Sequence, residues 1–467
     1  MHPAIGYIQE RREAFVEELK DFLRIPSVST KAEHKEDVQK AAEWLVGRMQ
    51  GIGLENARVM PTAGHPVAYA EWLKAPGKPT ALIYGHYDVQ PAEPLDLWVT
   101  GPFEPSVRGR ELFARGAVDD KGQVFMHLKA LEAHLKTGGA LPVNVKLLIE
   151  GEEEIGSPSL DAFIRRHARL LAADVAVISD TAMIAKGYPG ITVGLRGLVY
   201  FQIDVQSTAT DLHSGGFGGA VENPAFALAR LLAQLKDRNG RILIPGFYDD
   251  VRRLTPEERR QLAGLPFSER KFQKDIGAAA LFGERGFTTL ERLWARPTLE
   301  VNGLLSGFTG EGAKTVLPAR AMAKVSMRLV PHQDPARIAR LFTQHVKRLA
   351  PKTVRVTVRE VSGRGAPWLA PADHPAMQAM ARAIQKGFGK QPVYTRTGGT
   401  IPVVATLTSL LELPCLLMGI GLPDENAHAP NEKLDLDNFH QGTLACAHLW
   451  NELAEAEGRG PQRRRGR

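Results

Sequence analysis

The chain has 467 residues, of which 43% are hydrophobic and 24% charged, a composition typical of globular proteins and a length that predicts two domains. The formal net charge of +7 does not indicate nucleic-acid binding, because five arginines lie in the last nine residues and the rest of the chain is near +2. We interpret residues 458–467 as a disordered, Arg-rich tail.

The sequence shows neither an export signal nor a membrane span. Charged residues interrupt the N-terminal segment, so no apolar signal-peptide core is present. The most apolar stretch, residues 401–421, contains Pro402 and Pro414 and is interpreted as a buried helix and strand. Cys415 and Cys446 lie among apolar neighbours, which predicts buried free thiols. We therefore expect a cytoplasmic protein with no membrane partner.

The first part of the chain alternates helical and strand patterns. Helices are predicted at 8–24, 37–52, 121–137 and 158–171, and strands at 67–72, 80–84, 143–149 and 175–178. This alternation predicts an α/β sheet with parallel strands, whose carboxyl ends carry the functional residues.

The pattern changes from about Gly197. Strands are predicted at 198–206, around Leu299, at 321–330 and at 354–360, with helices at 224–237 and 335–349. This β-α-β-β-α-β order predicts a separate α+β domain inserted into the first. After Asp373 the α/β pattern resumes, with helices at 374–388, 401–411 and 436–455 and a strand at 415–419. The expected domains are 1–197 and 366–457 for the α/β part and 198–365 for the insertion.

Five short segments place metal-ligating residue types after apolar runs. They are Gly85–Asp88, Ala117–Gly122, Glu150–Glu154, Ile178–Asp180 and Glu425–His428. Imidazole and carboxylate groups on rigid elements are the ligands that zinc or manganese selects. More than three hundred positions separate the first segment from the last, so the whole fold would assemble this site.

Each segment taken alone has a simpler interpretation. Asp119, Asp120 and Asp180 could be helix caps, and Glu152–Glu154 a solvated charge run. The glutamates follow an apolar strand, however, which favours burial. The occurrence of all five segments in one chain favours a metal site.

In this order and spacing, the segments resemble the co-catalytic zinc exopeptidase family that includes carnosine dipeptidases, aminoacylases, acetylornithine deacetylase and carboxypeptidase G. The motifs Gly85–Pro91, Asp211–Gly215 and Ser326–Pro331 are most similar to the cytosolic dipeptidase branch. The similarity covers nearly the whole chain except the tail. It implies a three-layer α/β/α catalytic domain of zinc-exopeptidase type, with an inserted ferredoxin-like domain that serves as a lid and in dimerisation.

The resemblance implies two divalent metal ions per subunit. Zinc is the expected metal, and manganese and cobalt are the alternatives. His86 and Asp180 would bind one ion, Glu154 and His428 the other, and Asp119 would bind both. A shared carboxylate offsets the repulsion of two dications about 3.5–4 Å apart. The family also implies a cis peptide bond between Asp119 and the next residue.

Two further carboxylates are expected to act in catalysis. Asp88 lies two positions after His86 in an extended segment, so it points the same way and can orient the imidazole. Glu153 is the expected general base for the attacking water. If the motif were aligned one residue earlier, Glu152 would be the base and Glu153 a ligand. The resemblance favours Glu153 as the base and Glu154 as the ligand.

The inserted domain and one later loop supply the expected substrate-binding residues. In the family, the equivalent of His213 reaches the partner's active site across a dimer and hydrogen-bonds the scissile carbonyl. Thr315 and Arg328 resemble residues that bind substrate, and a guanidinium suits a terminal carboxylate. Arg328 could instead pair with a carboxylate of the protein. Gly398 and Thr400 resemble a loop that offers donors to the substrate carboxylate.

The predicted function is metal-dependent hydrolysis of dipeptides or short peptides by a homodimer joined through the inserted domain. An N-acyl or N-carbamoyl amino-acid amidohydrolase would use the same site. A non-catalytic binding or assembly protein is the alternative of another class, and the complete set of ligand and base residues argues against it.

Overall fold

The computed structural model describes residues 2–361, 363–371 and 373–456. The predicted Arg-rich tail, 458–467, lies outside the described residues. The chain divides into two compact units. Unit 1 contains the described residues up to Val193, Ala370–Thr395 and those from Pro402 onward, and unit 2 contains Gly194–Leu369 and Arg396–Ile401.

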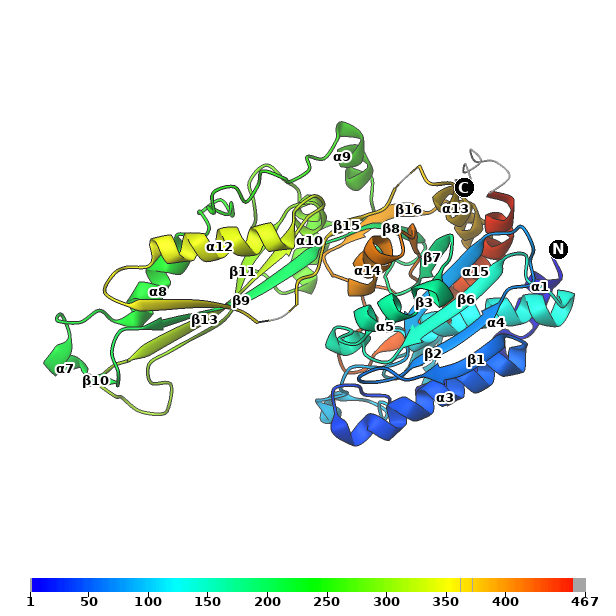
Figure 1. Ribbon diagram of the computed structural model, residues 1–467, viewed down its shortest axis with the longest axis horizontal. Helices are drawn as coiled ribbons and strands as arrows, with labels where there is room; N and C mark the ends of the chain where they lie inside the picture. Colours follow the sequence, from blue (N-terminus) through cyan, green and yellow to red (C-terminus); the bar gives the residue numbers. More distant parts are fainter. Residues whose placement is uncertain (1, 362, 372, 457–467) are drawn as a thin grey trace. The chain divides into compact units, whose positions relative to one another are not determined.

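Unit 1 is built on a large mixed sheet in the order β1-β2-β6-β3-β7-β17-β8 (Figure 1). Its strands are β1 (Glu55–Met60), β2 (Val67–Trp72), β3 (Thr80–His86), β6 (Asn144–Glu150), β7 (Val175–Ile178), β17 (Cys415–Leu417) and β8 (Gly190–Leu195). Strands β6, β3, β7 and β17 are mutually parallel, as predicted. The prediction of a parallel sheet is wrong for its two sides, because β1, β2 and β6 pair antiparallel and β17 pairs antiparallel with β8. Strands β1 and β2 are joined by a short connection without a helix, which permits only antiparallel pairing.

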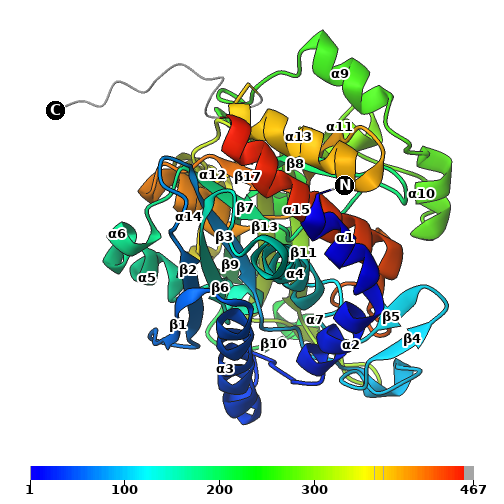
Figure 2. The same cartoon turned by 90° about the vertical axis from the view of Figure 1, so that its right-hand side faces the viewer.

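Helices cover both faces of this sheet, which gives the three-layer α/β/α arrangement predicted. Figure 2 shows α5 and α14 on one side of the strands and α4 and α15 on the other. The helices are α1 (Pro3–Glu10), α2 (Arg12–Leu23), α3 (Lys35–Ile52), α4 (Lys121–Gly138), α5 (Leu160–Arg166), α6 (Ala168–Leu171), α13 (Pro375–Phe388), α14 (Pro402–Leu410) and α15 (Leu436–Ala456).

Two of the predicted helices are interrupted. The helix predicted at 8–24 is instead α1 and α2, and the backbone leaves the helical conformation at Arg11. The change of direction allows Ile5 and Ile8 of α1, as well as Phe15 and Leu19 of α2, to be buried. The helix predicted at 158–171 is likewise divided into α5 and α6.

The buried centre of the sheet brings the functional segments to one edge. Strands β3, β6 and β7 are apolar and almost completely buried, as expected for parallel strands covered on both faces. Their carboxyl ends therefore lie together. Gly85 allows β3 to approach the start of α4, because a Cβ there would lie 2.4 Å from a Val124 methyl and 2.8 Å from Asp120 Oδ2. A small sheet of β4 (Ser106–Arg108), β5 (Glu111–Phe113) and β18 (Lys433–Asp435) completes the strands of unit 1.

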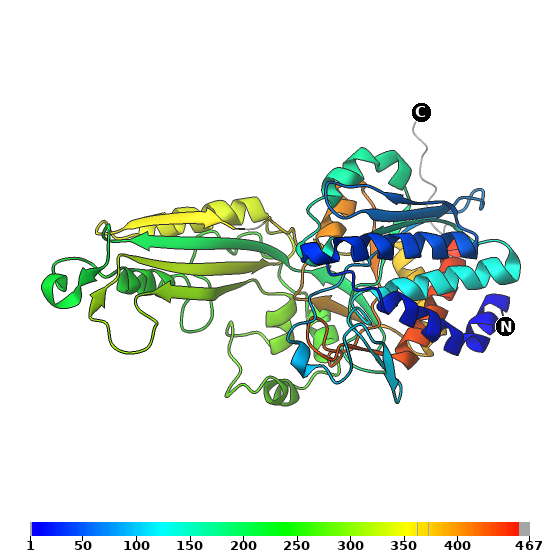
Figure 3. The same cartoon turned by 90° about the horizontal axis from the view of Figure 1, so that it is seen from below.

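Unit 2 contains an antiparallel sheet in the order β11-β13-β9-β14 (Figure 3). The main elements are β9 (Gly197–Gln206), α8 (Pro224–Ala233), β11 (Thr298–Ser306), β13 (Arg320–Leu329), α12 (Pro335–Leu349) and β14 (Arg355–Glu360). Burial alternates along β9 and β13, and the buried side chains pack with the apolar sides of α8 and α12. The β-α-β-β-α-β chain order and this strand order confirm the predicted ferredoxin-like insertion.

Shorter elements extend unit 2. They are β10 (Leu212–His213), α7 (Ser214–Phe217), α9 (Pro256–Ala263), α10 (Glu269–Asp275), α11 (Thr289–Trp294), β12 (Val316–Leu317) and β15 (Trp368–Leu369), while β16 (Val393–Thr397) runs across the boundary of the units. Strands β10 and β12 form a separate two-stranded ribbon. Within the described ranges, no helix is long and apolar enough to cross a membrane.

Candidate active site

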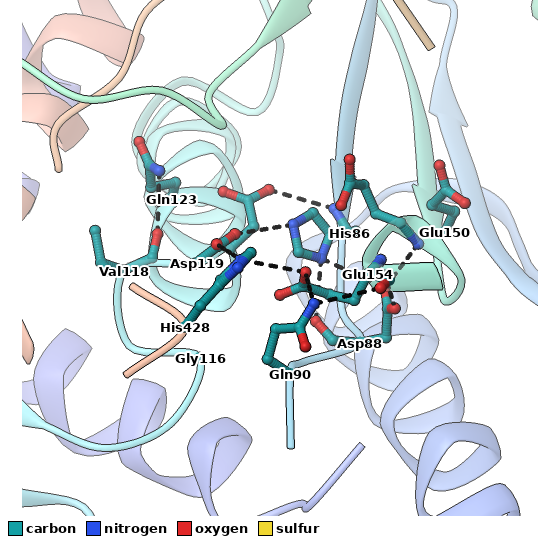
Figure 4. A network of polar contacts seen from close by, with 12 residues as sticks. His86, Asp88, Gln90, Gly116, Val118, Asp119, Gln123, Glu150, Glu154 and His428 are labelled. Atoms are coloured by element: carbon teal, nitrogen blue, oxygen red, sulfur yellow. Dashed lines mark hydrogen bonds and ion pairs between the residues drawn. The ribbon is translucent and has the colours of Figure 1, made fainter. Parts of the chain in front are cut away.

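Two groups of metal-ligating side chains meet at the carboxyl edge of the unit 1 sheet. The first contains His86, Asp119 and Asp180, and the second contains Asp119, Glu154 and His428. Within each group the candidate ligand atoms all lie within 4.8 Å of one another. Asp119 belongs to both groups, so five residues from five separate segments surround one centre (Figure 4 labels four of them).

Asp119 offers one carboxylate oxygen to each group. Its Oδ1 lies 3.1 Å from His86 Nε2, and its Oδ2 lies 2.9 Å from His428 Nε2. Burial opposes ionisation of Asp119, but hydrogen bonds with His428 and His86 outweigh it and hold the pKa of this carboxyl well below its usual range. The peptide bond between Asp119 and Asp120 is cis, as the resemblance predicted.

His428 is held by acidic neighbours on an exposed loop. Its Nε2 also lies 3.3 Å from Glu154 Oε2. The hydrogen bonds to Asp119 and Glu154 raise the pKa of His428 to about 10. The imidazole nitrogen of His428 and the carboxylate oxygens of Asp119 and Glu154 therefore lie close together, as the ligands of one metal ion do.

Asp88 connects the His86 segment with the glutamate segment. Its carboxylate accepts hydrogen bonds from the backbone N–H groups of Glu153 (3.2 Å) and Glu154 (3.1 Å). His86 Nδ1 lies 3.0 Å from the Asp88 carbonyl oxygen and 3.4 Å from Asp88 Oδ1. Asp88 therefore fixes both the imidazole and the start of the short 3₁₀ helix Glu153–Ile155.

The three consecutive glutamates have different surroundings. The Glu152 carboxylate is buried, accepts from the backbone N–H groups of His65 and Ser159, and belongs to neither ligand group. Burial raises the pKa of Glu153 to about 7, with Glu154, Asp119 and Asp88 adding to the effect of burial. A carboxyl with such a pKa is suited to accept and return a proton near neutral pH.

The donor set fits two divalent cations. Each group combines one imidazole nitrogen with carboxylate oxygens, and the shared carboxylate supplies an oxygen to each side. Zinc, manganese and cobalt are all compatible with such a mixed set.

In unit 2, the ribbon of β10 and β12 brings His213 and Thr315 together. His213 pairs with Val316, and the Ser214 N–H donates to the Thr315 carbonyl at 3.0 Å. His213 Nδ1 accepts from the N–H groups of Gly215 (3.1 Å) and Gly216 (3.2 Å). The ring proton is therefore on Nε2, and the exposed imidazole presents that atom as a donor.

Arg328 of β13 and the loop of Gly398–Thr400 also meet in unit 2. Arg328 Nη1 donates to Thr400 Oγ1 at 3.0 Å, and the Thr400 hydroxyl donates to the Arg196 carbonyl at 2.5 Å. Burial lowers the pKa of Arg328. Within the described residues its guanidinium forms no ion pair, so the alternative in which Arg328 pairs with a carboxylate of unit 2 is not supported.

Arg196 belongs to this cluster and was missed by the sequence analysis. Its Nε donates to the Gly398 carbonyl at 3.3 Å, while the buried Nη1 has no hydrogen-bond partner within the described part of the chain. Burial and the nearby charge of Arg328 lower the pKa of Arg196 to about 10. A buried guanidinium without a carboxylate is costly, which points to an anionic ligand. The sequence signal was slight: one arginine with no acidic neighbour, between two glycines and two apolar strands.

Comparison with known proteins assigns the family. The model of peptidase family M20/M25/M40 matches residues 82–452. The chain belongs to this family. The prediction of a metallopeptidase-type hydrolase is thereby confirmed, and so is the resemblance from which it came.

Similar proteins of this M20 family span the whole chain. The Cys-Gly metallodipeptidase dug1 of Schizosaccharomyces pombe is 36% identical over 465 residues, covering 96% of this chain and 97% of that protein. The crystal structure of human carnosine dipeptidase 1 has a TM-score of 0.82 and 32% identity, covering 97% of this chain and 98% of the other. The crystal structure of an M20 metallo-carboxypeptidase from Sulfolobus solfataricus has a TM-score of 0.83 and 33% identity, covering 94% of this chain and 99% of the other.

Proposed function

We propose that this M20 peptidase is a metal-dependent dipeptidase that hydrolyses the peptide bond of dipeptides or short peptides. The observation that carries the proposal is the pair of ligand groups that share Asp119, with the Glu153 segment held beside them by Asp88. The similar proteins named above include two dipeptidases.

The proposed ligands are divided as the two groups suggest. His86 and Asp180 would hold one ion, Glu154 and His428 the other, and Asp119 both; we expect zinc, with manganese or cobalt as alternatives. When bound, such ions lower the pKa of a water molecule and polarise the scissile carbonyl.

Glu153 is the proposed general base. Its carboxylate would take a proton from the attacking water as the C–O bond forms. It would then return that proton to the leaving amine nitrogen as the C–N bond breaks, so that Glu153 ends in its starting state. The pKa of about 7 supports both transfers, because neither form of the carboxyl is strongly disfavoured near neutrality.

The arginine cluster of unit 2 is the proposed binding site for the free carboxylate of the substrate. Arg328 and Arg196 carry positive charge and form no ion pair among the described residues of unit 2. Thr400 accepts from the Arg328 side chain and donates to the Arg196 main-chain carbonyl, and Gly398 accepts from Arg196 Nε. A planar guanidinium binds a carboxylate through paired N–H donors. His213 would donate from Nε2 to the carbonyl oxygen as negative charge develops there. Thr315, beside it on the ribbon, would contact the same part of the substrate.

We also propose a homodimer joined through unit 2, in which His213 serves the partner's active site. The support is strand β11, which lies at the edge of its sheet and exposes Val301, Leu304 and Leu305. An apolar edge strand with unpaired backbone groups is suited to pairing with another chain.

The deciding experiment compares two substrate classes on the same enzyme. The purified chain, loaded with zinc or manganese, is given a panel of dipeptides with free termini and the matching N-acetyl and N-carbamoyl amino acids. We expect hydrolysis of dipeptides at much higher kcat/KM. Preferential cleavage of the N-acylated compounds would instead identify an amidohydrolase, and no hydrolysis of either class would refute an enzyme.

We propose a cytoplasmic location, because Cys415 and Cys446 are both buried free thiols. Cell fractionation checks this proposal. Recovery of the native protein mainly outside the cytoplasm would contradict it.

A further inference from the structure

A buried ion pair lies next to the ligand groups but belongs to neither. Glu432, four residues after His428, is fully buried, and Arg115, four residues before Asp119, is 1% exposed. Arg115 Nη1 donates to Glu432 Oε2 at 2.7 Å. Burial of two charges is costly unless every remaining donor and acceptor is used, so the further contacts of this pair are informative.

Glu432 holds the whole segment that leads to Asp119. Its Oε2 also accepts from the Gly116 N–H at 2.8 Å, and its Oε1 accepts from the N–H groups of Val118 (3.0 Å) and Asp119 (3.1 Å). In addition, the Ala114 N–H donates to the Glu432 carbonyl at 3.1 Å. The two carboxylate oxygens thus accept four hydrogen bonds, which fills their acceptor sites and leaves none for a cation.

Arg115 extends the connection to a third segment. Its Nη2 donates at 3.1 Å to the carbonyl of Pro91, three residues after Asp88. Its guanidinium also lies 5.5 Å from the ring centroid of Trp98. The ion pair therefore joins the segments that carry His86, Asp119 and His428.

The His428 loop depends on such side-chain contacts. His428 has φ = 64°, and Asn426 and Asn431 are also left-handed, a conformation that is unfavourable for residues with a Cβ. Asn431 accepts from the Val99 N–H at 2.9 Å and donates to the Leu97 carbonyl at 2.7 Å. A loop with this backbone keeps one conformation only where its neighbours hold it.

We infer that Glu432 and Arg115 are positioning residues that fix the shared carboxylate of Asp119 relative to His86 and His428. The inference rests on the proposed function only in assuming that these three side chains bind metal. Glu432 belongs to neither ligand group, and it acts through the backbone of the Asp119 segment. Contacts of this kind change metal affinity by roughly 10–100-fold when they are removed.

The test compares Glu432→Gln with Glu452→Gln. Glutamine keeps the shape of the Glu432 side chain, but an NH₂ group replaces one carboxylate oxygen. A hydrogen-bond donor would then face backbone N–H groups that need an acceptor. Glu452 of α15 is a matched control, because it is also buried in unit 1 and ion-paired, and its polar partners among the described residues, Arg382 and Lys386, lie outside the ligand segments. Zinc affinity is measured by competition with a chromophoric chelator, and the unfolding temperature is measured on the metal-free proteins.

We expect both variants to lose stability, but only Glu432→Gln to lose zinc affinity, by roughly 10–100-fold at both sites because Asp119 is shared. Equal affinities in Glu432→Gln and the parent chain, or an equal loss in Glu452→Gln, would overturn the inference. If Glu432→Gln does not fold, Arg115→Lys serves instead. It keeps the charge but replaces the two nitrogens that bond Glu432 and the Pro91 carbonyl with a single one, so a normal affinity in this variant would also overturn the inference.

The same measurements separate this inference from the proposed function. A chain that binds two zinc ions but cleaves no dipeptide contradicts the function, while the affinity comparison still tests the positioning role. A chain that binds no metal contradicts both.

Discussion

The two units differ in which charged groups gather at their proposed sites. In unit 1, Asp119 lies between two imidazoles and Glu432 pairs with Arg115, while burial and neighbouring carboxylates raise the pKa of Glu153 and of Asp180. In unit 2, Arg196 and Arg328 are largely withdrawn from solvent, and neither forms an ion pair among the described residues of that unit. This difference supports the proposal that unit 1 binds cations and that unit 2 binds the carboxylate of the substrate.

Removal of metal has the largest expected effect and acts on unit 1. Dialysis against a chelator should abolish dipeptide hydrolysis and lower the unfolding temperature, because bound ions stabilise only the folded chain. Zinc or manganese should restore both. Full activity in a chain shown by elemental analysis to be metal-free would contradict the assignment of unit 1.

Glu153→Gln should lower kcat by about 10²–10⁴-fold, because the amide cannot accept the proton of the attacking water. Metal content should remain that of the parent chain. Glu152→Gln is the matched control, since Glu152 is the adjacent glutamate and points to His65 and Ser159. The assignment of the base fails if the Glu152 variant is the one that loses kcat with its metal retained.

His213→Ala should lower kcat by about 10²–10³-fold if its Nε2 proton stabilises developing negative charge. Subunit mixing then shows where His213 acts. When inactive His213→Ala and Glu153→Gln chains are unfolded, mixed and refolded together, a role across the dimer restores activity in mixed dimers. A role within one subunit restores none, and light scattering shows whether a dimer forms at all.

Arg328→Met and Arg196→Met should mainly raise KM for dipeptides, since hydrogen bonds to charged groups contribute about 1.5–3 kcal/mol, or roughly 10–150-fold. Dipeptide amides, which lack the terminal carboxylate, provide the control. The parent chain should bind them weakly, and the substitutions should change their KM little. An equal rise in KM for both substrate types would show that the arginines support the fold of unit 2 only.

A smaller effect is expected from a carboxylate of unit 2 that does have partners. Glu258 is ion-paired with Arg252 and Arg396; burial opposes its ionisation, but these contacts lower its pKa to about 2. Because this pKa is below the usual 4.5, the ionised Glu258 contributes its full stabilisation of the folded state above pH 4.5. That stabilisation is lost as the pH falls toward 2. The difference in free energy of unfolding between the parent chain and Glu258→Gln should therefore shrink over this range. A constant difference would contradict the lowered pKa.

Much of the fold could be predicted because its signals are local. The apolar run of β3, the amphipathic pattern of α12 and the β-α-β-β-α-β order of unit 2 follow from the spacing of residues along the chain. Strand direction at the sides of the unit 1 sheet could not be predicted. The strands β1 and β2 show the same apolar patterns whether they pair parallel or antiparallel, and only the path of the connections decides between these pairings.

The residues of the candidate site also differ in how well the sequence predicted them. Residue types with specific chemistry, such as His86, Asp119 and His428, stood out in the sequence because imidazole and carboxylate have few other reasons to follow buried strands. Arg196, Arg115 and Glu432 did not, since a charged residue far from a recognisable motif is usually solvated. The four hydrogen bonds to Glu432 join segments more than three hundred positions apart, and the contacts of Arg196 with Gly398 and Thr400 join segments about two hundred positions apart.

The sequence by itself determined the family, the order of the elements and the kinds of groups that could bind metal, because these depend on residue type and spacing. Only the tertiary structure decided what surrounds each of the three glutamates, which arginines form no ion pair among the described residues of their unit, and which buried pair joins the ligand segments. Those properties depend on contacts between distant parts of the chain, and no local pattern encodes the distance between two such atoms.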